Sequence, residues 1–251
     1  MNQQFELNHH LENSEVSLYQ QLVKKLKNTP IPDNEILANI GLFFNRSSMA
    51  RTLFFDDLYK QIINSHGVVM EFGVRWGQTL NILLSLRSMY EPYNISRKII
   101  GFDTFSGFPT TSKEDGDSSK VQVGNYAVST NYKDELEDLL QLQESLNPKA
   151  AIKKFELVEG DVLETLPSYL EKHQETVISL VYFDLDLYLP TKKCLEAILP
   201  YCHQGTIFAF DELCYEDFPG ETQAFREVFA GLKYQVFRSP TSPQQSYVKL
   251  L

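Results

Sequence analysis

The sequence predicts an α/β protein whose mostly parallel, seven-stranded sheet has helices on both faces and ends in an antiparallel hairpin. Three observations support this fold class. Short apolar, strand-like runs alternate with amphipathic, helix-like runs from residue 67 to residue 230, which is typical of a parallel sheet covered on both faces. The last two strand-like runs are separated only by "SPTSPQ" (239–244), which favours a hairpin. A chain of 251 residues can form one such domain with an added segment.

The N-terminal part of the chain differs from the rest. Residues 1–45 are polar and carry a helical pattern, so we expect an N-terminal helical extension followed by a main domain over 46–251. The next helix is expected from Ser47 to Ile63, with Ser47 or Ser48 as its cap. Its apolar stripe would consist of Leu53, Phe54, Leu58 and Ile62.

Strands and helices then follow in turn, each recognised by its apolar period. The strands are expected at 67–73, 98–103, 154–161, 176–184, 205–212, 233–238 and 245–251, and the helices at 78–90, 134–146, 163–173, 190–199 and 221–230. The polar segment 104–131 is too long for a plain connection and is expected to act as a lid or substrate loop. Within it, "EDGD" (114–117) is expected to be solvated, with substrate contact as the alternative.

Composition and charge exclude several classes of protein. Apolar residues make up 43% and charged residues 22%, as in ordinary globular domains. The net charge of −10 argues against a nucleic-acid partner. Three cysteines without metal-type spacing argue against a zinc site and a disulfide framework. Because no apolar run is long enough to span a membrane and no signal peptide is recognised, we expect a cytoplasmic protein without a membrane partner. The helical stripe in residues 1–45 suggests self-association as a homo-oligomer.

An acidic residue stands at the carboxyl end of every expected parallel strand. These residues are Glu71, Asp103, Asp161, the pair Asp184 and Asp186, and the pair Asp211 and Glu212. One such acid is often only a helix cap, but capping alone does not account for five strands. Ligands of doubly wound sheets bind at this end of the strands. We therefore expect the binding site there.

The first three strand ends favour a cofactor with a cationic group. Gly73 and Gly77 let the backbone turn and approach a ligand, although a plain strand-to-helix turn explains them equally well. The acid Glu71 beside them disfavours a pyrophosphate and suits the amino acid end of S-adenosylmethionine. Asp103 is then placed to accept hydrogen bonds from two ribose hydroxyls, and Asp161 one from the adenine amino group.

The last two parallel strands favour a hard cation. Asp184, Asp186, Asp211 and Glu212 offer only oxygen ligands, which select Mg²⁺ or Ca²⁺ over zinc. The alternative is that Asp184 or Asp211 only caps the helix that follows.

Five segments in order resemble the macrocin-type sugar O-methyltransferases: "VVMEFGVRWGQT", "IIGFDTFSGFP", "VEGDVLETLP", "YFDLDLYLPTKKCLEAILP" and "GTIFAFDE". The resemblance covers about Ser47 to Ala230, and "FDTFSGFP" and "DLDLY" are its most specific parts. It implies the Rossmann-like fold of class I methyltransferases and dependence on S-adenosylmethionine and Mg²⁺. It also implies methylation of a hydroxyl on a small-molecule acceptor, a sugar or glycosylated natural product.

By position, the resemblance implies that Asp184, Asp211 and Glu212 hold Mg²⁺ and that Asp184 or Asp186 is the general base. The pair of acids after the fourth strand then has a reason: one binds the metal and the other takes the proton. The sequence departs from the family pattern twice. The family has two aspartates where this chain has Asp211-Glu212, and it has glycine where this chain has Leu185.

Three other functions remain open from the sequence. A methyltransferase of a catechol-like small molecule would use the same cation chemistry. A nucleotide-dependent oxidoreductase would need a third glycine in the first turn. A non-catalytic binding protein on this fold would not need the acids after the fourth and fifth strands.

Overall fold

The computed structural model describes residues 13–242 and 244–251 and divides into two compact units at the Arg51–Thr52 bond. The first residues of the predicted N-terminal extension, 1–12, lie outside the described residues. The first unit contains the helices α1 (Asn13–Lys27), α2 (Asp33–Ile36) and η1 (Leu37–Phe43). None of the described helices has both the length and the apolar character that crossing a membrane requires.

Helix α3 (Arg46–Ile62) begins earlier than predicted, and its cap differs. The side chain of Asn45 accepts a hydrogen bond from Ser48 N at 2.8 Å, so Asn45 takes the capping position that we expected Ser47 or Ser48 to fill. Leu53 was also predicted wrongly as part of the buried stripe, because its side chain is 43% exposed while Phe54, Leu58 and Ile62 are buried.

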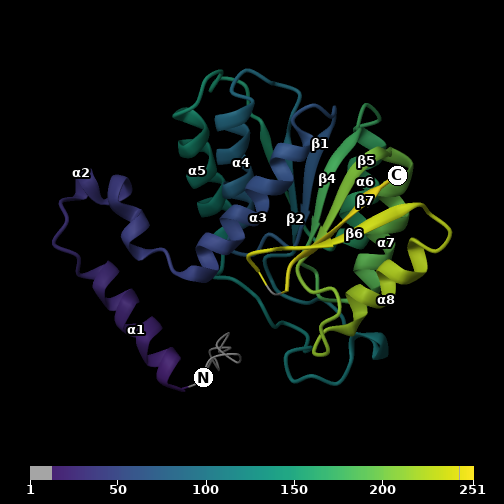
Figure 1. Cartoon of the computed structure of the whole chain (residues 1–251), viewed down its shortest axis with the longest axis horizontal. Helices are drawn as coiled ribbons and strands as arrows, with labels where there is room; N and C mark the ends of the chain where they lie inside the picture. Colours follow the sequence, from purple (N-terminus) through teal and green to yellow (C-terminus); the bar gives the residue numbers. More distant parts are fainter. Residues whose placement is uncertain (1–12, 243) are drawn as a thin grey trace. The chain divides into compact units, whose positions relative to one another are not determined.

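The second unit contains a seven-stranded sheet in the order β3-β2-β1-β4-β5-β7-β6 (Figure 1). Its strands are β1 (Val68–Phe72), β2 (Ile99–Asp103), β3 (Phe155–Glu159), β4 (Ile178–Phe183), β5 (Cys202–Phe210), β6 (Tyr234–Arg238) and β7 (Ser246–Leu250). The first five are mutually parallel, and β7 runs antiparallel between β5 and β6. The predicted fold class, a mostly parallel sheet with a C-terminal antiparallel hairpin, is therefore confirmed.

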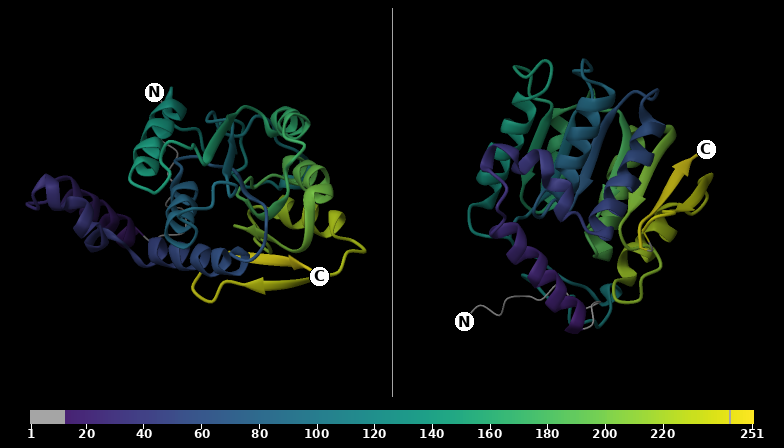
Figure 2. Two further views of the ribbon diagram at one scale, coloured as in Figure 1. Left: turned by 90° about the horizontal axis from the view of Figure 1, so that it is seen from above. Right: turned by 60° about the vertical axis from the view of Figure 1, so that its left-hand side comes forward.

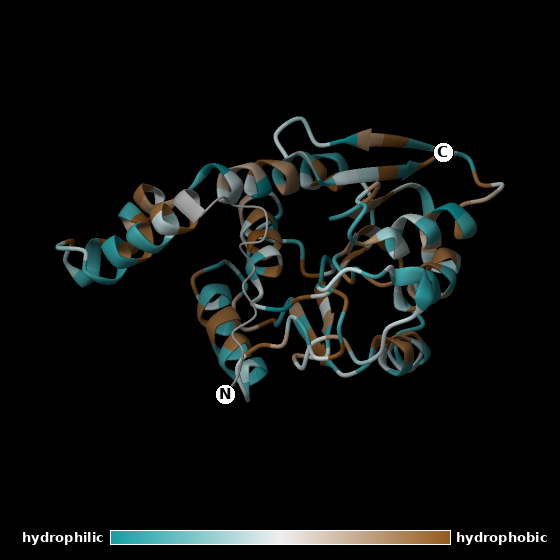
Figure 3. Ribbon diagram, turned by 90° about the horizontal axis from the view of Figure 1, so that it is seen from below, coloured by the Kyte–Doolittle hydropathy of each residue, from teal (hydrophilic) through white to brown (hydrophobic). Residues whose placement is uncertain are grey.

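Helices cover both faces of this sheet (Figure 2). The helices are α4 (Gln78–Tyr90), α5 (Tyr132–Ser145), α6 (Val162–Lys172), α7 (Tyr188–Ile198) and α8 (Pro219–Val228), with the short turns η2 (Lys113–Asp115) and η3 (Leu199–Tyr201). Side chains of α3, α4 and α5 pack on one face, and those of α6, α7 and α8 on the other. The helices combine apolar and polar bands, as expected when only one side is buried (Figure 3). Strand β4 lies between the two layers and is buried at every residue.

Candidate functional site

The register of the sheet places the predicted acids in one row across its carboxyl end. Phe72 of β1 lies opposite Phe102 of β2 and Phe183 of β4, and Phe183 lies opposite Phe210 of β5. Phe210 in turn lies opposite Ser246 of the antiparallel strand β7. One step further along each strand, the row reads Asp103, Gly73, Asp184, Asp211 and Gln245. Side chains at one step of neighbouring parallel strands share a face, so these residues are lateral neighbours.

Gly73 is required by the close approach of β1 and β4. Its φ is +91°, and a Cβ built on it would lie 2.0 Å from the carbonyl oxygen of Asp184. Gly77, with φ +76°, caps α4, and a Cβ there would lie 2.5 Å from the Leu136 side chain. Both glycines are therefore required by close neighbours, Gly73 by the Asp184 backbone and Gly77 by the Leu136 side chain.

Two backbone N–H groups hold the Asp103 carboxylate. Oδ2 accepts a hydrogen bond from Arg75 N at 2.7 Å, and Oδ1 accepts one from Phe105 N at 2.5 Å. Burial raises the pKa of Asp103, and these backbone donors oppose that effect. Since each carboxylate oxygen can accept a second hydrogen bond, the predicted contact with ribose hydroxyls stays a prediction that this geometry permits.

Two other predicted cofactor residues, Glu71 and Asp161, are already held by contacts within the protein. Glu71 is 1% exposed and lies opposite Tyr182 in the β1–β4 ladder, two residues before the row. The Asp161 side chain accepts a hydrogen bond from Leu163 N at 2.9 Å and so caps α6. The capping alternative therefore holds for Asp161, and its role toward adenine stays a prediction.

The acids after β4 and β5 form one electrostatic cluster, which also contains Glu221 of α8. Burial first, and then the charges of Asp184 and Asp211, raise the pKa of Asp186 well above its ordinary value. Burial, and then Asp186 and Asp211, raise the pKa of Glu212 from 4.5 to about 10. Glu221 is 1% exposed, and its pKa is likewise raised by burial. Full ionisation of the cluster is therefore unfavourable, because burial and mutual repulsion both oppose it.

Two hydrogen-bond donors fix the orientation of Asp211 in this cluster. The Tyr182 hydroxyl lies 2.7 Å from Asp211 Oδ1 and 3.3 Å from Asp184 Oδ2. The Gln245 amide donates to the same Oδ1 atom at 2.9 Å. Glu221 holds the backbone of the next residue, Glu212, because its Oε2 accepts a hydrogen bond from Glu212 N at 3.1 Å.

The residue chemistry of the cluster suits a hard cation, although its side chains are not arranged as a ligand set. Across 13–242 and 244–251, no three His, Cys, Asp or Glu side chains are grouped so that they could hold a metal ion. The donors are nevertheless all oxygen, and Glu212 Oε2 and Glu221 Oε1 are buried without a hydrogen-bond partner in the described part of the chain. Mutual repulsion and unpaired carboxylate oxygens are what a divalent cation would relieve.

The long loop 104–131 folds over this end of the sheet and has a small core of its own. Phe108 of the loop packs with Leu187 and Phe218, and Tyr126 packs against them. The Arg75 guanidinium lies 5.2 Å from the centre of the Tyr126 ring. Because Arg75 also interacts electrostatically with Asp184, Asp186 and Asp103, it connects the loop with the acids at the carboxyl ends of both β2 and β4.

Asp115 corrects the expectation that "EDGD" is solvated. Its side chain is 1% exposed. Oδ2 accepts a hydrogen bond from Ser112 N at 2.6 Å, and Oδ1 accepts one from Tyr188 N at 2.5 Å. Asp115 thereby joins the loop to the start of α7. A second link is the ion pair between Lys120 and Asp217, with an N···O distance of 2.6 Å.

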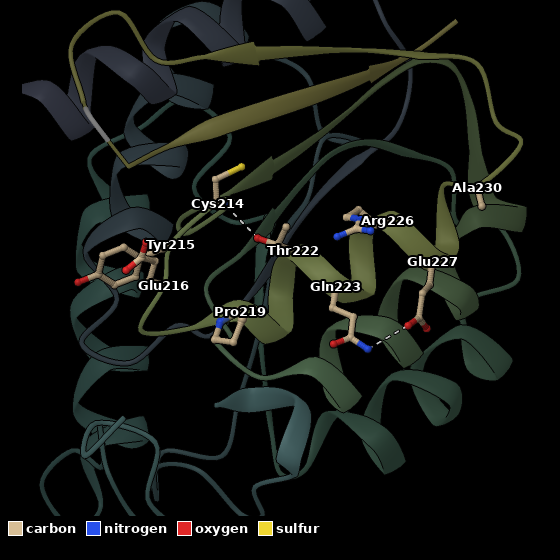
Figure 4. Close-up of a pocket in the computed structure, with 9 residues that line it drawn as sticks. All are labelled: Cys214, Tyr215, Glu216, Pro219, Thr222, Gln223, Arg226, Glu227 and Ala230. Carbon is tan, nitrogen blue, oxygen red and sulfur yellow. Dashed lines mark hydrogen bonds between the residues drawn. The ribbon is translucent and has the colours of Figure 1, made fainter. Parts of the chain in front are cut away.

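A pocket of about 800 Å³ lies beside this region, between α8 and the loop after β5 (Figure 4). It is lined by Cys214, Tyr215, Glu216, Pro219, Thr222, Gln223, Arg226, Glu227 and Ala230. None of the predicted site residues lines it. We therefore place the candidate active site at the acid row and not in this pocket.

Several residues of the site escaped the sequence analysis. Tyr182, Gln245 and Glu221 reach it through strand register or through the first turn of α8. A tyrosine in an apolar strand and an acid in a first helical turn are both common in other roles, so neither gives a signal. Only the sequence "YFD" (182–184) indicates one of them, because the side chains of a strand alternate between its faces and Tyr182 therefore shares a face with Asp184.

Comparison with known proteins identifies the family. No family model and no curated protein matches the chain. A solved structure of the calicheamicin methyltransferase CalS11 is 42% identical, with 95% of this chain and 93% of that chain covered and a TM-score of 0.90. An apo structure of CalS11, described as a TDP-rhamnose 3′-O-methyltransferase, is 39% identical with 95% of each chain covered and a TM-score of 0.81.

A third solved structure supports the fold alone. The O-methyltransferase NovP is 18% identical, with 80% of this chain and 79% of that chain covered and a TM-score of 0.63. Together with the sheet order and the 42% identity to CalS11, these findings identify the chain as a member of the macrocin-type family of S-adenosylmethionine-dependent O-methyltransferases, with the class I methyltransferase fold.

Proposed function

We propose that this enzyme transfers the methyl group of S-adenosylmethionine to a sugar hydroxyl of a TDP-linked deoxysugar such as TDP-rhamnose. The observation that carries the proposal is the row at the carboxyl end of the sheet. It begins with a carboxylate suited to ribose, Asp103, and continues through Gly73 to the acids Asp184 and Asp211. The acceptor class is suggested by CalS11, which is described as acting on TDP-rhamnose.

The cofactor half of the site consists of Glu71, Gly73, Gly77, Asp103 and Asp161. S-adenosylmethionine supplies the methyl group when bound. In this proposal Asp103 accepts hydrogen bonds from the ribose hydroxyls, while Gly73 allows the tight turn that brings the end of β1 close to Asp184. The buried Glu71 lies next to the turn and favours the cationic amino acid end.

The acceptor half consists of the acids after β4 and β5. Methyl transfer from a sulfonium needs an in-line approach of the hydroxyl oxygen, so positioning supplies much of the rate. Asp184 or Asp186 takes the hydroxyl proton. The loop 104–131, held by Asp115 and Lys120, covers this end of the sheet and limits the access of water.

We also propose that Asp184, Asp211 and Glu212 hold a divalent cation, Mg²⁺. The oxygen-only chemistry of the cluster and the buried, unpaired Glu212 Oε2 support this, the latter judged within the described residues. Mg²⁺ would lower the pKa of an acceptor hydroxyl. Glu212 replaces the second aspartate of the family pattern, so its longer side chain would have to reach the same cation.

Residues 1–45 are proposed as a helical extension through which the enzyme forms a homo-oligomer. Leu18, Leu37 and Leu42 in this segment are exposed apolar side chains, which is typical of an association surface. Light scattering coupled to gel filtration tests this directly. Leu18→Glu and Leu42→Glu should shift an oligomer toward monomer, whereas a wild type that is already monomeric contradicts the proposal.

The acceptor is tested by mass spectrometry with methyl-labelled S-adenosylmethionine. Wild type is incubated with TDP-rhamnose or with catechol, in Mg²⁺ or in a chelator. We expect one labelled methyl group on the nucleotide sugar, lost in chelator and lost in Asp184→Asn. The exposed loop variant Asp117→Asn serves as a matched control and should retain activity. Labelling of catechol alone would overturn the sugar acceptor in favour of the catechol-like alternative.

A further inference from the structure

The C-terminal strand contributes a buried side chain to the candidate active site. Gln245 stands immediately before β7, is 3% exposed, and donates from its Nε2 atom to Asp211 Oδ1 at 2.9 Å. It is the lateral neighbour of Asp211 in the row, because Phe210 pairs with Ser246. The antiparallel hairpin thus reaches the acids that the parallel strands supply.

Among the described residues, the other end of the Gln245 amide has no hydrogen-bond partner. Its Oε1 atom is buried and makes no hydrogen bond within 13–242 and 244–251. The orientation is set by chemistry, since an ionised carboxylate only accepts and therefore requires the NH₂ group of Gln245 to face Asp211. A buried carbonyl without a donor is costly, and such groups in folded proteins are usually satisfied by water or a ligand.

The position of Gln245 in the row indicates whether the cofactor or the acceptor would donate to its Oε1 atom. Strands in a sheet lie about 4.8 Å apart, so Gln245, four strands from Asp103, is about 19 Å from the ribose side of the row. It is two strands from Asp184 and therefore on the acceptor side. The missing hydrogen-bond donor then belongs to the acceptor, whose class offers hydroxyl groups.

We infer that Gln245 is a substrate-contacting residue of the methyl transfer. Its Oε1 accepts a hydrogen bond from a hydroxyl of the bound sugar next to the one that is methylated, while its Nε2 holds Asp211. The inference rests on the proposed function for the identity of the acceptor. It adds that the C-terminal hairpin selects acceptors with a hydroxyl at that place.

The test is calorimetric titration of TDP-rhamnose into the complex with S-adenosylhomocysteine. It uses wild type, Gln245→Met, and the matched control Gln235→Met, whose glutamine is exposed on the neighbouring strand β6. Loss of one hydrogen bond predicts a five- to tenfold higher Kd for Gln245→Met, taking about 1–1.4 kcal/mol per bond. The Kd for S-adenosylmethionine and both affinities of the control should equal those of wild type.

A second measurement, urea unfolding with and without TDP-rhamnose, separates a contact role from a structural one. Gln245→Met also removes the hydrogen bond from Nε2 to Asp211, so its unfolding midpoint should lie below that of Gln235→Met. Saturating TDP-rhamnose should raise the midpoint of wild type more than that of Gln245→Met, because only wild type offers Oε1 to the sugar. If wild type binds TDP-rhamnose and Gln245→Met binds it equally well, the inference is overturned. If wild type does not bind TDP-rhamnose, the proposed acceptor is wrong. In that case the inference falls together with the acceptor, whereas an equal rise of the midpoint in wild type and Gln245→Met on binding overturns the inference alone.

Discussion

Replacing Tyr182 by phenylalanine removes one hydroxyl from the centre of the site and little else. The ring lies in the core, packed edge-on against Phe55 at a centroid distance of 4.8 Å, and it leaves no cavity when only the oxygen is lost. The hydroxyl lies 2.7 Å from Asp211 Oδ1 and 3.3 Å from Asp184 Oδ2. The variant therefore reports what this one donor contributes to the acid cluster.

The expected magnitude follows from the charge of its partner. A hydrogen bond to an ionised group contributes about 1.5–3 kcal/mol, and its loss leaves Asp211 with the Gln245 donor but less compensation for its neighbours. We expect the free energy of unfolding to fall by about 2 kcal/mol. In a chain of this size that lowers Tm by about 4–8 °C. Because Asp211 also loses its fixed orientation, kcat should fall more than the affinity for S-adenosylmethionine.

The matched control is Tyr247→Phe on strand β7. Its hydroxyl accepts a hydrogen bond from the exposed Gln61 side chain at 3.3 Å, and its ring stacks on Phe237. Loss of this exposed bond should cost less than about 0.5 kcal/mol. Urea and thermal unfolding of both variants check the prediction. Equal stability of the two variants would refute the reasoning, because it would mean that Tyr182 contributes nothing through Asp211.

Three more predictions concern the turn, the loop and the charge of the cluster. Gly73→Ala should lower the free energy of unfolding by about 3 kcal/mol, because its Cβ would lie 2.0 Å from the Asp184 carbonyl oxygen. Gly231→Ala, at a similar φ but with no atom near its Cβ, should lower it by only about 1 kcal/mol. Denaturant unfolding of the two variants checks this difference. Asp115→Ala should speed proteolysis of the 104–131 loop and weaken acceptor binding, while the affinity for the cofactor stays unchanged. Proteolysis of the loop at the wild-type rate would contradict the anchoring role of Asp115. Without divalent cations, the free energy of unfolding should fall as pH rises from about 4.5 toward about 10, because the folded protein keeps a proton on Glu212 that the unfolded chain releases. Saturating Mg²⁺ should reduce this fall. A free energy of unfolding that does not change with pH in the absence of cations would contradict the prediction.

Local patterns were sufficient to predict most of the elements. The helix at 78–90 has the predicted bounds, because it follows a glycine turn and keeps one apolar side in period. Boundaries depended on details that a pattern does not contain. Asn45 caps α3 because it is the last residue before the helical backbone, although Ser47 and Ser48 have equally good capping chemistry. Leu139 fits the apolar period of α5 but is 47% exposed, since only Leu136 and Leu140 reach the sheet.

The candidate site was predictable only where it lies in sequence next to a strand end. Asp184 and Asp211 could be recognised because each directly follows an apolar run. Gln245 could not be recognised, since its place beside Asp211 depends on the register of an antiparallel strand that is far away in the sequence. Asp115 looked like part of a solvated acidic stretch, and its burial depends on the packing of a loop against α7.

The central claim is that one row of residues divides into a cofactor half at Asp103 and an acceptor half at Asp184. Calorimetric titration of S-adenosylmethionine into wild type, Asp103→Asn and Asp184→Asn tests it most directly. We predict that Asp103→Asn raises the Kd at least about tenfold, through loss of charged hydrogen bonds, and that Asp184→Asn binds within about twofold of wild type. Normal binding by Asp103→Asn, or loss of binding by Asp184→Asn alone, would contradict this division of the site.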